Sequence, residues 1–437
     1  MKDAGDFDDV IGFAWDGPSG AVAQSARLLL LDSLGCMIAG LGHAMPRRFA
    51  AALAITMPGP VHLPGCAAGI SEGGAAAVLA AAMCWDEANE GLARAHGRPA
   101  LAVAPLCIAA LAAGRVSLRT AHQAFALGYE IAARAGEIWR IRPGMHVDGS
   151  WHALGAAAAA ARLAGGDAAE VARAVRLTAC QIPFALYAPI AAGMDGRNSY
   201  PAHAVLLGAM AAAAARAGMD APADGLAEAR RLALLHETPA LRAAAGEWLI
   251  AEAYIKPFAG VRHAHYAAAA ALALRAAIAG RLGVVSALRL ETYAEALRYA
   301  ANRTPVRAIQ AQFSLSWAVA AALMQGDLGP AAYTDAALAD PALRRLEALV
   351  EFAEDKALTK VEQRGARLIV TLANGETHQA SVRAIAGDAG LALDEAAVLA
   401  KCQRFAGRVI GEAQMARLAA LILAADGAAP RGFFTEA

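Results

Sequence analysis

Apolar residues recur almost without interruption through the first half of the chain, from Val22 to about Leu249. No stretch of this half alternates apolar and polar residues as a half-buried strand does, and glycine or proline ends successive runs, as at Pro99, Pro143 and Pro201. The pattern therefore predicts a large domain built entirely of helices. The expected helices cover residues 22–40, 73–88, 100–114, 118–142, 154–163, 168–180, 202–217 and 226–235.

Two of these predicted helices carry unusual local sequence. The helix over residues 22–40 contains Gly35, Ala39 and Gly40, whose small side chains would let another helix approach closely. Residues 156–161 are six consecutive alanines, the residue with the highest helix propensity. Because Gly149 and Gly155 are poor helix formers, a loop should pass into a helix between them.

The pattern changes after Lys256. Residues 285–293 partly alternate, and two strand-like runs, 368–372 and 377–382, flank Asn374-Gly375, a dipeptide typical of tight hairpins. Helices are expected over 313–324 and over 341–353, the latter with Asp340 as N-cap and Pro341 in its first position. From Asp394 the chain becomes helical again. The expected organisation is an all-helical domain of residues 1–255 and 391–437, with a smaller α+β domain of residues 256–390.

Composition narrows the class of protein. Hydrophobic residues make up 58% of the 437 residues and mean hydropathy is +0.40, but alanine supplies much of this value. Prolines interrupt the uncharged run 49–71, and residues 100–114 fall short of the roughly 20 apolar residues that cross a bilayer. The 39 basic and 39 acidic residues balance, without a basic cluster. We therefore expect a soluble protein that binds neither membrane nor nucleic acid.

The cysteines and the start of the chain indicate the cytoplasm. The six cysteines are scattered among small apolar residues without a Cys-x-x-Cys pair, which is typical of reduced core cysteines. Residues 1–6 are acidic and lack the apolar region of a secretory signal.

The clearest candidate for chemistry is the segment 144–155, which holds His146 and His152 just before the alanine-rich helix. Backbone N–H groups at a helix start favour an anion, and a histidine there tends to be neutral and able to accept a proton. The alternative is that both histidines only cap or pack locally.

Three further polar segments, 85–99, 195–203 and 256–266, interrupt the apolar helices. Each also has a purely structural interpretation: a solvated helix end with salt bridges, N-capping by Asn198 or Ser199, and surface basic groups. Together they hold more cations and imidazoles than carboxylates, which suggests a pocket for a small anion with several carboxylates. The candidate residues are Asp86, Glu87, His96, Arg98, Arg197, Tyr200, His203, Lys256, Arg262 and His265.

No cofactor or metal motif stands out. The pairs His146-x5-His152 and His263-x-His265 lack a third ligand at a recognised spacing, and no glycine-rich phosphate loop or nucleophile elbow occurs. Cofactor-free acid–base chemistry without a metal is what we expect.

In this order and spacing the motifs resemble the MmgE/PrpD family, which includes 2-methylcitrate dehydratase, cis-aconitate decarboxylase and iminodisuccinate epimerase. The resemblance covers nearly the whole chain and implies a large helical domain completed by the C-terminal tail, a smaller α+β domain and a homodimer. It is carried by Leu31–Cys36, Gly128–Glu130, His146 before Gly155, Lys256–Phe258 with Arg262 and His265, Phe313–Leu315, and Asn374-Gly375.

The resemblance also implies roles. His146 matches the family's active-site histidine, Lys256 matches its junction lysine, and the first aspartate of the family's acidic patch falls on Asp86 or Glu87. Two positions depart from the family: its His-Pro reads Arg98-Pro99, and a lysine is replaced by Arg197. Arginine stays protonated, so it binds charge but is a poor proton shuttle.

The expected activity is proton abstraction alpha to a carboxylate of a small di- or tricarboxylate. His146 would be the base, Asp86 or Glu87 the partner acid, and Arg98, Arg197, Lys256 and Arg262 would hold the substrate carboxylates. The reaction of the better-known members is expected to transfer only if His96 takes over the role of the missing histidine. Dehydration is favoured, with epimerisation or decarboxylation as alternatives. A non-catalytic carboxylate-binding member is the remaining hypothesis, motivated by the two arginines.

Overall fold

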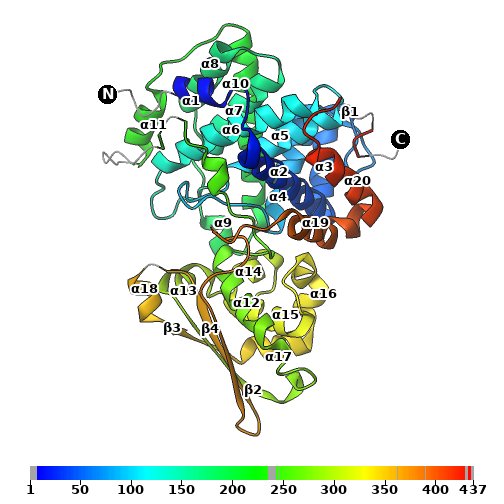
Figure 1. The fold of residues 1–437 in the computed structure, drawn as a ribbon, viewed down its shortest axis with the longest axis vertical. Helices are drawn as coiled ribbons and strands as arrows, with labels where there is room; N and C mark the ends of the chain where they lie inside the picture. The colour runs from blue at the N-terminus through cyan, green and yellow to red at the C-terminus, as the bar shows by residue number, and fades with distance from the viewer. Residues whose placement is uncertain are drawn as a thin grey trace.

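The computed structural model describes residues 7–234, 243–244, 246–361, 363–388, 390–428 and 432–434. The chain forms a large helical part and a smaller part with a sheet (Figure 1). The helical part contains α1 (Asp8–Ala14), α2 (Gly20–Leu41), α3 (Ala44–Thr56), α4 (Glu72–Trp85), α5 (Ala100–Ala112), α6 (Leu118–Ile138), α7 (His152–Leu163), α8 (Ala168–Ala179), α9 (Ala188–Ala191), α10 (Tyr200–Arg216) and α11 (Gly225–Leu234), with the short η1 (Asp195–Ser199) before α10.

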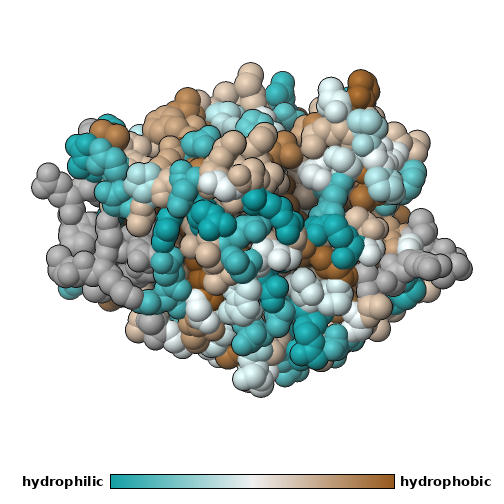
Figure 2. Space-filling view, turned by 90° about the horizontal axis from the view of Figure 1, so that it is seen from above, coloured by the Kyte–Doolittle hydropathy of each residue, from teal (hydrophilic) through white to brown (hydrophobic). Residues whose placement is uncertain are grey.

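Helix α2 is central to the helical part. It packs against α4, α5 and the C-terminal helices α19 (Glu395–Ile410) and α20 (Glu412–Leu423), which bring the end of the chain beside its beginning (Figure 1). Among the described helices α2 alone has the length and hydropathy of a membrane span, yet residues 28–41 are buried inside the protein. The outer end of the helical part shows polar and apolar residues mixed (Figure 2).

Small residues set how closely the helices pack. A Cβ added to Gly40 would lie 2.0 Å from the carbonyl oxygen of Ala82 in α4, and one on Gly35 would lie 2.7 Å from the sulfur of Cys402 in α19. Likewise a Cβ on Gly155 of α7 would lie 2.4 Å from the carbonyl oxygen of Gly128 in α6. These contacts confirm that the small residues of 22–40 permit close helix approach.

The smaller part holds a four-stranded sheet in the order β3-β2-β4-β5, formed by β2 (Val285–Thr292), β3 (Val350–Glu354), β4 (Ala366–Leu372) and β5 (Thr377–Val382). β2 and β3 are parallel and the other pairs antiparallel. Helix α12 packs against β4 and β5. The remaining elements are η2 (Leu249–Glu252), α12 (Arg262–Arg275), η3 (Leu282–Val284), α13 (Ala294–Ala300), α14 (Ala308–Gln312), α15 (Leu315–Gln325), η4 (Pro330–Tyr333), α16 (Asp335–Ala339), α17 (Pro341–Ala348) and α18 (Lys356–Lys360).

The mainly α fold with an α+β part, and the hairpin at Asn374-Gly375, agree with the sequence prediction; Gly375 has the positive φ that such a turn requires. Two element predictions are wrong. The helix expected over 341–353 ends at Ala348, because the residues beyond it pair with β2 as strand β3. The half expected to lack strands contains the four-residue β1 (Pro58–Val61), which bridges to Ile70. Residue 235 of the last predicted helix and residues 1–6 lie outside the described residues.

The Gly40 contact gives a test of this packing. Gly40→Ala should lower the free energy of unfolding by about 1–3 kcal/mol, because a backbone carbonyl blocks the added methyl. Gly12→Ala in α1 is the matched control, since its Cβ meets no atom within 4 Å. It should keep or slightly raise stability, because alanine is the better helix former. Urea unfolding measures both, and equal midpoints would contradict the close approach of α2 and α4.

Candidate active site

The site is built around the turn that ends α4. Asp86 caps the helix, and Glu87 follows in the left-handed region with φ of 53°, which is uncommon for a residue with a side chain. Donors from four other segments bind the four successive carbonyl groups of this turn. They are Gln312 Nε2 to Trp85 O (2.9 Å), Gly260 N–H to Asp86 O (2.9 Å), Lys256 Nζ to Glu87 O (2.7 Å) and Lys401 Nζ to Ala88 O (2.8 Å).

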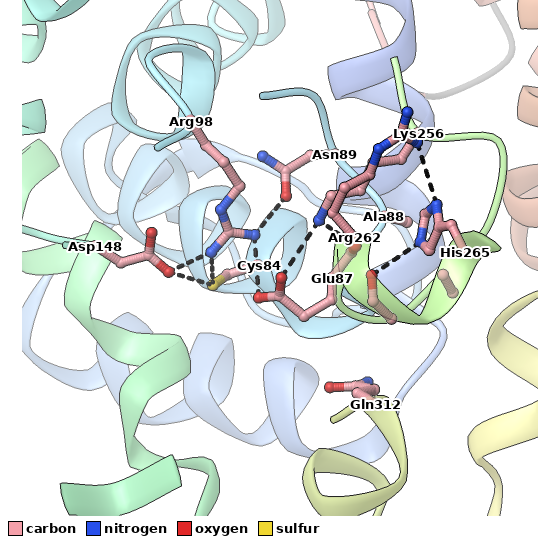
Figure 3. A network of polar contacts seen from close by, with 12 residues as sticks. Cys84, Glu87, Ala88, Asn89, Arg98, Asp148, Lys256, Arg262, His265 and Gln312 are labelled. Atoms are coloured by element: carbon pink, nitrogen blue, oxygen red, sulfur yellow. Dashed lines mark hydrogen bonds and ion pairs between the residues drawn. The ribbon is translucent and has the colours of Figure 1, made fainter. Parts of the chain in front are cut away.

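At this turn the side chains of Asp86 and Glu87, the two carboxylates that the sequence left as alternatives, point to different partners. Asp86 points to His43, whose Nε2 lies 2.8 Å from its Oδ1. Glu87 instead points toward Arg98 and Lys256 (Figure 3), and it also pairs with Arg197. Glu87 is therefore the member of the pair that belongs to the charged network.

The Glu87 carboxylate is bound by three buried cations. Arg98 lies at 3.1 Å and Lys256 at 3.4 Å, and Arg197 forms a third ion pair. Burial alone would raise the pKa of Glu87, but Arg197, Arg98 and Lys256 together lower it to about 2. The carboxylate is thus ionised at neutral pH.

A second buried carboxylate, Asp148, completes the network. It pairs with Arg98, and Cys84 Sγ lies beside the same guanidinium group (Figure 3). Asp148 also lies 3.3 Å from Arg197, whose guanidinium group contacts Cys84 Sγ as well. Burial would raise the pKa of Asp148, but Arg98, His146 and Arg197 lower it below its usual range. Sequence reasoning missed Asp148, although its position two residues after His146 was a usable signal.

His146 is held in one tautomer. The backbone N–H of Asp148 donates to its Nδ1 at 3.0 Å, so the neutral ring carries its proton on Nε2. The ring stacks on Tyr187 at a centroid distance of 5.9 Å and meets Tyr200 edge-on at 6.2 Å. Burial, assisted by Arg197 and Arg98, lowers the pKa of His146 to about 4.

His152 takes a different place from His146. It is the first residue of α7, is fully buried and stacks on Trp151 at 3.8 Å. Burial lowers its pKa to about 3. Within the described residues neither ring nitrogen has a hydrogen-bond partner, and the ring makes no ion pair with the network.

Among the described residues, Arg197 is the one cation of the network with an unpaired edge. Its side chain is fully buried on η1, and its NH1 serves Glu87, Asp148 and Cys84. Its Nε and NH2 have no hydrogen-bond partner among the described residues. Buried guanidinium N–H groups are costly to leave unpaired, so this edge is suited to a ligand carboxylate.

The junction residues lie next to this network. Burial lowers the pKa of Lys256 to about 8, despite the opposing effect of Glu87. Arg262 pairs with Asp388 and lies over the rings of Tyr254 and Tyr266, at 4.8 and 5.6 Å. His265 is buried behind it, with Nε2 3.1 Å from the carbonyl oxygen of Gly260 (Figure 3).

Three predicted residues are not brought into the network. His96 is exposed, and within the described part of the chain it makes no hydrogen bond or ion pair with Glu87, Arg98 or Asp148. Tyr200 and His203 line a separate, mainly apolar cavity of about 510 Å³, and only Tyr200 reaches His146.

Among the described residues, Cys84, Glu87 and Asp148 form the one group whose atoms lie close enough to share a metal ion. Both carboxylates are already neutralised by Arg98 and Arg197. Burial also raises the pKa of the Cys84 thiol. These charges disfavour a cation at this position, and the cluster is an ion-pair network.

Comparison with known families settles the relationship of the chain. The MmgE/PrpD N-terminal domain matches residues 10–238, and the MmgE/PrpD C-terminal domain matches residues 258–426. The chain belongs to the MmgE/PrpD family. This family includes lyases such as dehydratases, so the match supports an enzyme of dehydratase or isomerase type. A search of curated proteins found no match.

Beside the network lies Glu90, a carboxyl that is fully buried. Its Oε1 accepts the backbone N–H of Ala100 at 2.9 Å, and its Oε2 has no partner among the described residues. Burial raises the pKa of Glu90 to about 8, so the group is mostly protonated at neutral pH.

Glu90 should make stability depend on pH. Between pH 4.5 and about 8 the folded state binds a proton that the unfolded state has lost, so Glu90 lowers stability by about 1.4 kcal/mol per pH unit as pH rises. Glu90→Gln, which keeps an acceptor oxygen, should therefore gain stability over the wild type as pH rises. Thermal unfolding at pH 5 and pH 8 measures this difference. The exposed control Glu351→Gln should show no such trend; a constant difference for Glu90→Gln would refute the protonated carboxyl.

Proposed function

We propose that this protein is a cofactor-independent enzyme that removes the proton alpha to a carboxylate of a small organic acid, with dehydration as the leading reaction. Epimerisation and decarboxylation are the alternatives, because all three share a carbanion-like intermediate. The observation that carries the proposal is the buried edge of Arg197, which is unpaired among the described residues. Arg197 and Lys256 both pair with Glu87, and the charge of Arg197 acts on His146. An acid bound there would place its alpha carbon among groups able to move protons.

The charges of the network support a role in stabilising the intermediate. Arg98, Arg197 and Lys256 face two carboxylates, Glu87 and Asp148, which leaves one formal positive charge when Lys256 is protonated. A preorganised positive charge in a buried site stabilises an enolate-like intermediate more than it stabilises the bound acid before the proton is removed. Arg98 and Arg197 balance the two carboxylates without exchanging protons themselves, so the positive charge appears when Lys256 takes up the proton.

We assign the proton transfers by tautomer and pKa. The sequence suggested His146 as the base, but its neutral ring has Nε2 protonated, which suits donation to a leaving group or to the intermediate. Lys256, with a pKa of about 8, has a neutral amine fraction near physiological pH and is the better base. We therefore propose Lys256 as base, with its ammonium form returning the proton to the leaving group or to the intermediate, and His146 as a hydrogen-bond donor to the same groups.

A panel of dicarboxylates and tricarboxylates in deuterium oxide tests the activity. We expect the wild type to exchange an alpha proton of at least one acid, detected by NMR. Arg197→Lys keeps the charge but loses the two-pronged edge, and should lower kcat/KM about 10- to 100-fold, the value of one or more charge-assisted hydrogen bonds. The exposed Arg216→Gln is the control and should be unchanged. Acids that bind without exchange would instead favour the non-catalytic carboxylate-binding protein suggested by the two arginines.

The pH dependence of exchange and two variants distinguish the roles of Lys256 and His146. If Lys256 is the base, the exchange rate should rise with pH and level off above about 8, because the neutral amine is the active form. Lys256→Met should lose exchange, whereas His146→Gln should retain exchange and lose product formation. A rate already level from pH 5 upward, abolished by His146→Gln, would instead make His146 the base.

A further inference from the structure

An apolar cavity of about 510 Å³ lies beside the loop that holds His146. Its wall includes the side chains of Phe184, Leu186, Met194 and Tyr200. Phe184, Leu186 and Met194 are 60%, 48% and 54% exposed, so a large apolar surface faces this space. Such a surface favours an apolar ligand group, because burial removes it from water.

The cavity wall and the candidate active site share structural elements. Arg197 and Tyr200 are three residues apart, across the junction of η1 and α10. The Tyr200 ring borders the cavity on one side and meets the His146 ring at 6.2 Å on the other. The backbone carbonyl oxygen of Ala185, another residue of the cavity wall, accepts a hydrogen bond from the backbone N–H of His146 at 2.9 Å. A single layer of residues thus separates the cavity from His146.

The cations of the site limit how many carboxylates a substrate can carry. Arg98 forms ion pairs with Glu87 and Asp148. Lys256 forms an ion pair with Glu87, and Arg262 forms one with Asp388. Of these four cations, Arg197 alone keeps a two-pronged edge that no residue in the described part of the chain pairs with. This supply suits one strongly bound carboxylate and does not match the three carboxylates of a tricarboxylic acid.

We propose that the substrate is a mono- or dicarboxylic acid with an apolar substituent, and that the cavity beside Tyr200 holds this substituent. The inference rests on the proposed binding of a carboxylate at Arg197, and it adds the class of acid. The Tyr200 ring then lies between the carboxylate of the acid and its apolar substituent. Movement of this ring connects the carboxylate site at Arg197 with the cavity.

Calorimetry with a series of matched acids tests the proposal without requiring turnover. The probes are succinate, 2-methylsuccinate, 2-butylsuccinate and 2-hexylsuccinate, with propane-1,2,3-tricarboxylate as the tricarboxylic acid. Affinity should rise along the alkyl series by up to about fourfold per methylene, and exceed that for the tricarboxylate. Phe184→Asn and Met194→Gln should flatten this rise and leave succinate affinity unchanged. Met210→Gln, exposed on α10 outside the cavity wall, is the control.

Several outcomes would overturn the inference. They are tighter binding of the tricarboxylate, equal affinity along the alkyl series, absence of binding by every acid, or an unchanged rise in the two cavity variants. If those variants dissociate an oligomer in sedimentation while the rise persists, the apolar wall is a contact between copies of the chain. Deuterium exchange without chain-length dependence would overturn only the substrate class, whereas chain-length dependence without exchange would overturn only proton abstraction.

Discussion

The site depends on the left-handed turn at Glu87. A glutamate costs free energy in this conformation, and such backbone persists only where the surroundings over-determine it. Here four donors bind four successive carbonyl groups, and they come from the junction loop, α14, α19 and the segment before α12. Every segment that holds the turn lies after residue 255, although the turn itself ends α4. Three of the four donors come from the junction and the smaller part, so the turn that holds Glu87 also links the two parts of the molecule.

Lys401 shows how far this dependence reaches. Its ammonium group is buried between the Asp32 carboxylate in α2 and the carbonyl oxygen of Ala88. Helix α19 thus contacts both the central helix α2 and the turn at Glu87 through one side chain. Removing a single partner of a buried ion pair is expensive, because it leaves the other charge uncompensated. This cost explains how a helix at the end of the chain constrains a turn formed 313 residues earlier.

Local chemistry was enough to predict much of the fold. Apolar periodicity indicated the long helices, Asn374-Gly375 marked the hairpin, and Gly40 marked a close helix contact, because each signal lies within a few neighbouring residues. Strand β3 was missed since Val350–Glu354 directly continues a helical run, and only pairing with β2 makes it a strand.

The candidate site was less accessible to such reasoning. The choice between Asp86 and Glu87 depends on one backbone angle, and that angle is held by residues distant in sequence. Asp148 was overlooked because its importance comes from Arg98 and Arg197, which are distant in the chain. The sequence pattern identifies the side chains that can bind charge or transfer protons. The fold decides which of these side chains lie together in one buried site.

The two arginines that depart from the family pattern change how the site can work. An arginine at position 98 or 197 fixes positive charge but takes no part in proton transfer, so the transfers fall to the remaining titratable groups. The same guanidinium groups help lower the pKa of His146, and Arg98 lowers that of Lys256. They also lower the pKa of Glu87 and keep it ionised. Among the cations of the network Lys256 is thus the one whose pKa is lowered to about 8, and this is why we propose it, and not an arginine, as the base.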